Sequence, residues 1–367
     1  MSRVRAVQFQ TYAGPLDLVD LAEPPAPDDG AVVRVEATGI CRSDWHGWRG
    51  HDPDITLPHV PGHEFAGVVH AVGRAVRLWR GGERITAPFV CGCGTCGSCA
   101  RGDQQVCERQ TQPGFTHDGS FAEYVVVRHA DVNLVRLPDT VDAISAAALG
   151  CRFATAFRAV VQQGRAAPGQ WVAVYGCGGV GLSAVMIATA SGARAVAVDV
   201  SPDALALAVE LGAEVTINPS VVAGSTDEAE SGDIAAGAAR LGAMVREATG
   251  GGVSLSIDAL GSLSTCAAAV HSLARRGRHV QVGLLPPVLG IPPIPMERVI
   301  GAELELVGSH GMAAHAYPQL LAAVEAGALR PDRLVTRRVG LDAIALVLAE
   351  MGDDAGPSQP GITVATP

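Results

Sequence analysis

Aromatic residues are scarce in this chain of 367 residues, at 4% of the sequence. Their scarcity argues against a core built on large rings, whereas 48% hydrophobic residues and 44 glycines indicate packing by valine, alanine and leucine. This balance is typical of an α/β enzyme and argues against disorder. The length exceeds what one hydrophobic core normally supports, so we expect two domains.

Long apolar runs and runs of positive charge are also missing. No apolar stretch is long enough to span a bilayer, and the formal net charge is −10. These absences argue against a nucleic acid or an anionic membrane as a partner. The first residues, MSRVRAVQFQ, alternate instead of forming an apolar signal core, so we interpret them as a first strand and expect a cytoplasmic protein. Nine cysteines fit such a reducing compartment if metal occupies most of them.

The texture of the sequence changes near residue 151. Before it, short valine-rich runs such as AVVRVEATGI and FAEYVVV predict a β-rich domain. After it, buried-strand runs such as WVAVYG and ARAVAVDV alternate with alanine-rich helical stretches, which predicts a parallel sheet. The run ELELVGSHG has no evident place in that repeat, and the acidic stretch 219–240 is interpreted as a surface insertion without an assigned role. We therefore expect domains over 1–151 and 152–307, with 308–367 returning to the first.

Four cysteines in the stretch CGCGTCGSCARGDQQVC have the spacing of a metal site. Cys93, Cys96, Cys99 and Cys107 follow one another at gaps of three, three and eight residues. Four thiolates leave no open coordination position, so we predict a structural zinc in a lobe spanning 91–107. Redox-active or disulfide-paired thiols are the alternative. Cys91 competes with Cys93 for one position, and we favour Cys93 because its gap to Cys96 repeats the next gap.

A glycine-rich loop predicts a dinucleotide site in the second domain. The motif GCGGVG, with Gly176, Gly178, Gly179, Val180 and Gly181, lies between the strand run WVAVY and a helical run. In that context the glycines allow a tight turn, close approach of a pyrophosphate and helix–strand packing. Asp199 stands eighteen residues beyond Gly181, at the end of the next strand run. Its carboxylate is placed to accept from both ribose hydroxyls and to repel a 2′-phosphate, which favours NAD over NADP; a helix N-cap is the alternative role.

The segments GICRSDWH and PGHE predict a second metal site in the first domain. Each carries a metal-binding side chain, Cys41 or His63, beside a carboxylate. Taken alone, Cys41 fits a small buried residue and His63 a hydrogen-bonded loop histidine equally well. Spacing alone therefore leaves a metal role and a structural role open.

Five ordered motifs together carry a family resemblance. CRSDWH, GHE, the four-cysteine loop, LGCRFATA and GCGGVG all occur in this chain, and the chain resembles the zinc-dependent medium-chain alcohol dehydrogenases over nearly its whole length. The resemblance implies a GroES-like catalytic domain joined to a Rossmann coenzyme domain with a doubly wound parallel sheet. It implies an enzyme with two zinc ions per chain that interconverts alcohols with aldehydes or ketones by hydride transfer to and from NAD.

The same resemblance implies roles for individual residues. Cys41, His63 and Cys151 would bind the catalytic zinc, with Glu64 behind the metal and Asp44 orienting His63. Ser43 and His46 match the inner and outer groups of a proton relay. The resemblance also suggests residues for the cofactor and for the substrate pocket: Arg42 for the pyrophosphate, Thr155 and Val180 for the nicotinamide ring, Val282, Gly283 and Leu284 for the carboxamide, and Ser43 and Phe89 for the pocket.

The chain departs from the family pattern in two places. The C-terminal GITVATP offers no arginine for the pyrophosphate, so Arg42 carries more of that contact. The tryptophan that narrows the pocket of ethanol-specific relatives is replaced within HDPD at 51–54, so we expect a roomier pocket.

The resemblance leaves other activities and assemblies open. A dehydrogenase of polyols, amino-alcohols or thiol adducts is the main alternative. A non-catalytic redox-sensing or structural homologue is disfavoured because Cys41, Ser43, His46, His63 and Glu64 are all present. A homo-oligomer is expected by resemblance, either a tetramer or a dimer, with dimers joined through the coenzyme domains.

Overall fold

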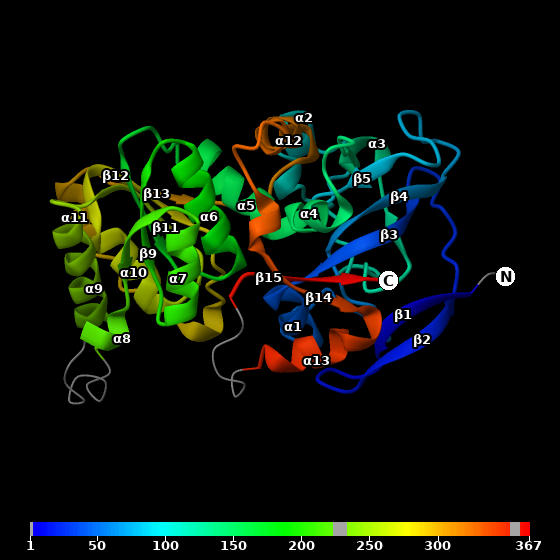
Figure 1. The fold of residues 1–367 in the computed structure, drawn as a ribbon, viewed down its shortest axis with the longest axis horizontal. Coiled ribbons are helices and arrows are strands. Elements are labelled where there is room, and N and C mark those ends of the chain that lie inside the picture. Colours follow the sequence, from blue (N-terminus) through cyan, green and yellow to red (C-terminus); the bar gives the residue numbers. More distant parts are fainter. Residues whose placement is uncertain (1–2, 223–232, 353–359) are drawn as a thin grey trace. The chain divides into compact units, whose positions relative to one another are not determined.

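The computed structural model describes residues 3–222, 233–352 and 360–367. The chain forms two compact units (Figure 1). The first contains Met1–Ala154, Gly311–Ser358 and Ile362–Pro367, and the second contains Thr155–His310 with Gln359–Gly361. The C-terminal part of the chain thus contributes mostly to the first unit.

The first unit is built on two sheets. Strands β1 (Arg3–Phe9) and β2 (Leu16–Ala22) form an antiparallel pair. A seven-stranded sheet follows the order β14-β15-β3-β4-β5-β7, with β6 pairing with β3 off this path. Its strands are β3 (Ala31–Ile40), β4 (Glu64–Val72), β5 (Arg84–Thr86), β6 (Tyr124–Val127), β7 (Val135–Arg136), β14 (Val335–Gly340) and β15 (Ile362–Thr366).

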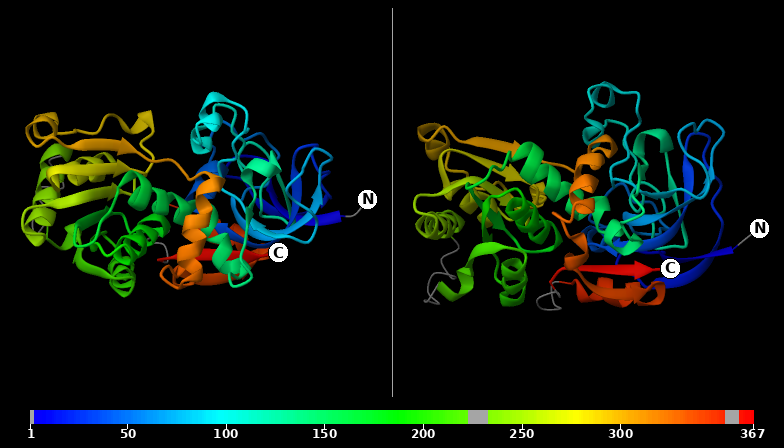
Figure 2. Two further views of the ribbon diagram at one scale, coloured as in Figure 1. Left: turned by 90° about the horizontal axis from the view of Figure 1, so that it is seen from above. Right: turned by 45° about the horizontal axis from the view of Figure 1, so that its top comes forward.

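Strand β3 is the centre of that sheet. It pairs antiparallel with β4, β6 and β15, and valine and alanine at Ala31, Val33 and Val35 pack into a buried cluster with Phe65 and Ile85. Strand β15, red in Figure 2, comes from the end of the chain and lies against β3, in blue. Because β3 is held on both sides, the residues at its end are placed on a rigid base.

Short helices occupy the connections of the first unit. They are α1 (Arg42–Trp48), α2 (Gly97–Ala100), α3 (Ala130–Asn133), α4 (Ala143–Ala147), α12 (Tyr317–Glu325) and α13 (Ile344–Glu350). Among the described residues, none of the helices of either unit combines the length and apolar character needed to cross a bilayer.

The second unit is a Rossmann fold. Its six-stranded sheet has the order β10-β9-β8-β11-β12-β13, and every neighbouring pair is parallel. The strands are β8 (Trp171–Tyr175), β9 (Arg194–Val198), β10 (Ala213–Ile217), β11 (Val253–Asp258), β12 (Leu273–Gln281) and β13 (Glu305–Gly308). The helices are α5 (Ala154–Phe157, which begins one residue before this unit), α6 (Gly179–Ala190), α7 (Pro202–Glu210), α8 (Pro219–Val222), α9 (Ile234–Ala248), α10 (Leu263–His271) and α11 (Met296–Gly301).

The strand order reverses at β8, which puts helices on both faces of the sheet. Strands β9 and β10 extend the sheet to one side and β11 to β13 to the other. Right-handed crossovers therefore place α6 and α7 on one face and α9 and α10 on the opposite face (Figure 1). The ELELVG run, for which the βαβ repeat offers no place, contains strand β13 (Glu305–Gly308), which lies at an edge of this sheet. In the acidic stretch 219–240, α8 and the start of α9 are helical, and 223–232 lie outside the described residues.

Candidate functional site

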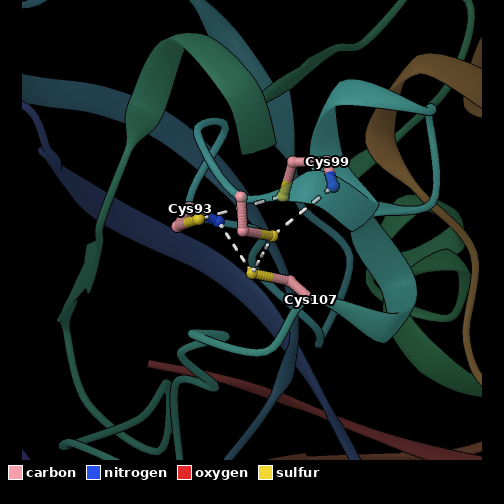
Figure 3. Close-up of side chains that lie close together, drawn as sticks. Cys93, Cys99 and Cys107 are labelled. Atoms are coloured by element: carbon pink, nitrogen blue, oxygen red, sulfur yellow. Dashed lines mark hydrogen bonds between the residues drawn. The ribbon is translucent and has the colours of Figure 1, made fainter.

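The four cysteines of the 93–107 loop converge on one point in the first unit. The sulfur atoms of Cys93, Cys96, Cys99 and Cys107 all lie within 4.8 Å of one another (Figure 3). Two of the separations are 4.0 Å, between Cys93 and Cys99, and 3.7 Å, between Cys96 and Cys107. Glycine at position 94 turns the chain with a φ of 72°, a conformation that side chains disfavour. Four convergent thiols are a donor set that suits zinc.

Backbone amides point at these sulfur atoms. The N–H of Thr95 lies 3.5 Å from Cys93 Sγ and lowers the pKa of Cys93 to about 5. The N–H of Cys99 likewise lowers the pKa of Cys96. Burial instead raises the pKa of Cys99 to about 12. Arg109 adds a positive charge 3.4 Å from Cys93 Sγ. The loop therefore already stabilises thiolate charge at Cys93 and Cys96, which a metal cation requires of its ligands, whereas Cys99 would lose its proton only when a cation binds.

Cys91 does not belong to this group. Its side chain is fully buried in the hydrophobic cluster around β3, and its thiol lies 3.5 Å from the carbonyl oxygen of Pro88. Burial raises the pKa of Cys91 to about 12. The structure thus brings Cys93, and not Cys91, to the other three cysteines.

A second convergent group joins three separate segments of the first unit. Cys41 lies between β3 and α1, His63 and Glu64 lie at the start of β4, and Cys151 lies in a π-helical turn, Leu149–Phe153. One donor atom from each of Cys41, His63, Glu64 and Cys151 lies within 4.8 Å of the others. Turns of this kind often occur at functional sites because the extra residue redirects a side chain.

Asp44 fixes the geometry of this second group. Its Oδ1 lies 2.8 Å from His63 Nδ1 and accepts from Gly62 N at 3.1 Å, and its Oδ2 accepts from Cys41 N at 2.8 Å. His63 Nε2 is buried and has no hydrogen-bond partner among the described residues. A metal cation fits this arrangement, because it would satisfy the orphaned nitrogen beside two thiols while Asp44 holds the other ring nitrogen.

Each ionisable side chain of the second group affects the pKa of its neighbours. A hydrogen bond from Cys151, with Arg152 and His63 nearby, lowers the pKa of Cys41 despite its burial, and the same hydrogen bond together with burial raises the pKa of Cys151. Burial alone would lower the pKa of His63, but Asp44 and Cys41 outweigh it and raise that pKa. Protons thus bind at the same atoms that a cation would occupy, so metal and protons compete.

Sequence reasoning missed the guanidinium beside this group. Arg152 donates to Glu64 Oε1 from its backbone N–H and from Nε, both at 2.9 Å, and its Nη2 donates to Oε2. Burial raises the pKa of Glu64, and the charge of Arg152 opposes that rise. The signal was an arginine inside the apolar run LGCRFATA, because a buried arginine needs a charged partner.

Helix α1 carries Ser43 and His46 one turn apart. Ser43 Oγ lies 3.8 Å from Cys41 Sγ, at the second group, whereas His46 is exposed and its Nδ1 lies 3.0 Å from Nδ1 of His51. Because i and i+3 positions share a helix face, Ser43 and His46 lead from the buried donors toward solvent. His51, within the HDPD stretch, is a second residue that sequence reasoning did not assign.

Two further predicted residues of the first unit have defined neighbours. The Phe89 ring stands 6.1 Å from the His63 ring, centroid to centroid, which places an apolar wall at the second group. Arg42 is exposed, stacks 4.7 Å from the centre of the Trp45 ring and donates to the Met351 carbonyl oxygen.

The glycine loop of the second unit runs from β8 into α6. Gly176 has a φ of 88°, and a side chain at Gly181 would clash with the Gly176 carbonyl oxygen. At Gly178 nothing lies within 4 Å of where a Cβ would stand, so the backbone is open there. Gly179 and Val180 begin α6. Helix α6 thus begins at the sheet's switch point, where the N-terminal end of a helix favours a phosphate.

Asp199 closes this loop from the end of β9. Its Oδ2 accepts from Cys177 N at 2.6 Å, and its Oδ1 accepts from Ser201 N at 2.8 Å. The N-cap of α7 is Ser201, whose side chain accepts from Ala204 N. Asp199 is therefore not that cap, and its half-buried carboxylate stands beside the glycine loop.

The remaining predicted cofactor residues lie at two other places in the second unit. Val282 and Gly283 follow β12, and both amides donate to the Asp258 carbonyl oxygen, at 3.0 and 2.8 Å, while Leu284 is exposed. The Thr155 hydroxyl is buried and has no hydrogen-bond partner among the described residues.

Comparisons with known proteins agree with this layout. The family model of the alcohol dehydrogenase GroES-like domain matches residues 27–139, and that of the zinc-binding dehydrogenase domain matches 179–326. An alcohol dehydrogenase of Geobacillus stearothermophilus is 33% identical over 308 residues, which are 83% of this chain and 84% of that protein. A D-arabitol-phosphate dehydrogenase of Enterococcus avium is 30% identical over 88% of this chain and 87% of its own length.

A solved structure extends the likeness to the whole fold. A zinc-binding dehydrogenase of Sinorhizobium meliloti 1021, bound to NADP, superposes with a TM-score of 0.84 and 28% identity over 100% of both chains. The expected GroES-like and Rossmann domains and the expected family are thereby confirmed. This chain belongs to the zinc-type alcohol dehydrogenases of the medium-chain dehydrogenase superfamily.

Proposed function

We propose that this protein is a zinc-containing, NAD-dependent dehydrogenase that interconverts small alcohols with aldehydes or ketones. The observation that carries the proposal is the second donor group: Cys41, His63 and Cys151 converge with an unpartnered ring nitrogen, and a hydroxyl stands beside them. Three such protein ligands leave one coordination position for a substrate oxygen. A zinc ion bound there would supply Lewis-acid polarisation of that oxygen.

The residues around the donor group have separate tasks in this proposal. Asp44 holds the His63 ring so that Nε2 faces the metal position. Phe89 contributes an apolar wall that keeps water away from the reacting carbon. Ser43 accepts the alcohol proton, and His46 at the exposed end of α1 passes it outward to solvent. The four-cysteine group holds a second zinc, which stabilises its loop and takes no part in chemistry.

The glycine loop and Asp199 bind the cofactor in this proposal. The backbone N–H groups at the start of α6 donate to the pyrophosphate oxygens, and Arg42 and Thr155 contribute as the family resemblance implies. Asp199 has further acceptor capacity for ribose hydroxyls and would repel a 2′-phosphate, so NAD is preferred. Since a structural relative holds NADP, the preference depends on this side chain and not on the fold.

Exchange of the ribose-binding residues tests the cofactor assignment. Wild-type protein should show a higher kcat/KM with NAD than with NADP. Asp199→Gly with Val200→Arg should move the preference toward NADP, because the repulsion is removed and a phosphate partner is added. Val200→Arg alone is the matched control, since it adds the positive charge and keeps the carboxylate. Equal or better turnover of NADP by wild-type protein would refute the assignment.

A substrate panel tests the reaction class. Initial rates in both directions should be measured with NAD on alcohols, diols, sugar alcohols and their phosphates, amino-alcohols and hydroxymethyl-thiol adducts. The HDPD stretch predicts activity on substrates bulkier than ethanol. The arabitol-phosphate relative makes polyols the second candidate class, which stronger activity on polyols or their phosphates would support. Absence of NAD-linked turnover with every member, in zinc-loaded protein, would contradict the proposal.

The second unit carries features suited to self-association. Strand β13 is one of the two edge strands of the six-stranded sheet, and Val288, Ile291 and Ile300 are exposed at 89%, 90% and 75%. An edge strand can pair with a second copy, and exposed apolar side chains can be buried against one. We propose a cytoplasmic homo-oligomer, a dimer or a tetramer, joined through this unit. Sedimentation should show it, and Ile291→Glu should weaken it.

A further inference from the structure

A buried ion pair stands directly beside the second donor group. Arg152 follows Cys151 in the chain, and its side chain is 8% exposed while that of Glu64 is 0% exposed. The backbone N–H, Nε and Nη2 of Arg152 all donate to Glu64, and between them they engage both carboxylate oxygens. Bidentate arginine–carboxylate pairs of this kind are stronger and more directional than a single ion contact.

The surrounding backbone leaves room for this pair. A side chain at Gly39 of β3 would clash with Glu64 Oε2 and stand 3.0 Å from Arg152 Nη2. A side chain at Gly150 would stand 3.1 Å from Glu64 Cα. Two glycines thus accommodate the pair where β3, β4 and the Cys151 turn meet. A side chain at Gly39 would displace the pair, and one at Gly150 would press on the backbone that carries Glu64, so the pair depends on both glycines.

Glu64 is close enough to the donors to become a ligand itself. One of its carboxylate oxygens lies within 4.8 Å of the donor atoms of Cys41, His63 and Cys151. Carboxylate oxygens are ordinary zinc ligands, and a fourth protein ligand closes a zinc site to substrate. The fourth coordination position can therefore stay open only if another interaction keeps the Glu64 carboxylate from binding the metal.

Charge balance also depends on the arginine. Two thiolates and Glu64 contribute three negative charges, which a divalent cation and Arg152 together neutralise. Without Arg152 the Glu64 carboxylate would be a buried charge lacking its partner, a strongly destabilised state. A metal bound by the second group would then offer that carboxylate a positive charge within reach.

We propose that Arg152 is a positioning residue that holds both oxygens of Glu64 away from the metal and so keeps the fourth coordination position open. The proposal rests on the proposed zinc function. It assigns to Arg152 no contact with the substrate. It makes the Arg152–Glu64 pair the element that separates an open, reactive metal site from a closed one.

The test reads whether the metal site accepts an outside ligand. Cobalt is exchanged into the second group, zinc is kept in the four-cysteine group, and the visible cobalt spectrum is followed during titration with imidazole in the absence of substrate. The cobalt spectrum of wild-type protein should change as imidazole binds to the metal. Arg152→Met should bind imidazole at least about tenfold more weakly, the range that loss of supporting interactions causes. Arg152→Met combined with Glu64→Gln should regain the response, because the competing carboxylate is gone.

Further variants keep the test decisive. Arg152→Lys keeps the positive charge but cannot donate to both Glu64 oxygens as the guanidinium does. Its affinity for imidazole should therefore lie between those of wild type and Arg152→Met. This variant replaces Arg152→Met in the test if Arg152→Met does not fold. Glu64→Gln alone should respond like wild type. An unchanged titration in both Arg152 variants would overturn the proposal, as would a double variant no better than Arg152→Met. A wild-type protein that takes up no cobalt at this group would instead refute the proposed zinc function.

Discussion

The two cysteine-containing groups of the first unit are assembled in opposite ways. Cys93, Cys96, Cys99 and Cys107 come from one continuous loop, whose own backbone amides point at the sulfur atoms. Cys41, His63 and Cys151 come from three distant segments that meet at the end of a buried sheet, with Asp44 and Arg152 around them. We call Cys93, Cys96, Cys99 and Cys107 the loop-borne group and Cys41, His63 and Cys151 the scaffold-borne group. A metal in the loop-borne group should stabilise its loop. The scaffold-borne group is held in place by the fold, so a metal bound there can take part in the reaction.

The largest expected effect is the loss of activity when the scaffold-borne group loses a thiol. Cys41→Ser should reduce kcat/KM by more than about a thousandfold, because metal polarisation is worth several kcal/mol and about 1.4 kcal/mol corresponds to a factor of ten. The far-ultraviolet circular dichroism spectrum and the midpoint of thermal unfolding should change little. Retention of even a tenth of the activity would show that Cys41 is not a ligand of the reacting metal.

The loop-borne group should respond in stability. Cys93→Ser should lose a zinc ion and lower the midpoint of thermal unfolding by more than about 5 °C, because binding energy at such a site is also folding energy. Cys91→Ala is the matched control: it removes a neighbouring buried thiol that lies outside the group, so the zinc content should be unchanged. If Cys91→Ala loses the zinc and Cys93→Ser keeps it, our choice between these cysteines is wrong.

The proton relay should show a gradient along α1. Ser43→Ala should cost on the order of a hundred- to ten-thousandfold in rate with NAD binding nearly unchanged, because the inner group has no substitute. His46→Gln should cost less, and small imidazole or amine buffers should restore part of the rate. A Ser43→Ala enzyme with near-full activity at neutral pH would refute the relay.

The structure adds a second histidine to that test. His51 lies 3.0 Å from His46 and can take over its outer role, so His46→Gln combined with His51→Gln should lose more than either change alone. If the double variant behaves like His46→Gln, His51 does not share the outer role.

A chelator should remove the metal of the scaffold-borne group before the metal of the loop-borne group. A chelator can attach at an open coordination position before the protein ligands let go, whereas four thiolates offer no such position. Treatment with dipicolinate should therefore abolish activity first and lower the unfolding midpoint only later. Simultaneous loss of both properties would mean that the groups do not differ as proposed.

The contrast between the groups also explains how far the sequence could be interpreted. The loop-borne group depends on cysteine spacing along one segment, which the sequence shows directly. The βαβ alternation and the GCGGVG motif predict the Rossmann fold, which the structure and the comparisons confirm. Cys151 could be assigned only through the family, because no local pattern connects it to Cys41. The short strand β13 was left unplaced, since parallel pairing with β12 is not encoded in its few residues.

Pairwise contacts that depend on three-dimensional packing were beyond the sequence. The Arg152–Glu64 pair joins residues far apart in the chain, and only the meeting of β4 with the Cys151 turn brings them together. The absence of Cys91 from the four-cysteine group has a similar cause. Its thiol is buried in the hydrophobic cluster around β3 and not beside the other sulfur atoms. Such choices follow from burial and register, which spacing does not report.

The central claim, that one metal is structural and the other supports the reaction, is tested most directly by counting zinc in three proteins purified without chelator. Elemental analysis should give about two zinc ions per chain in wild-type protein and about one in both Cys41→Ser and Cys93→Ser. The zinc that remains in Cys93→Ser is the one at the second group, so Cys93→Ser protein that stays folded should be active. The zinc that remains in Cys41→Ser is the structural one, so that protein should be inactive. A wild-type value near one that persists after zinc supplementation, or activity in the Cys41→Ser protein, would contradict the account.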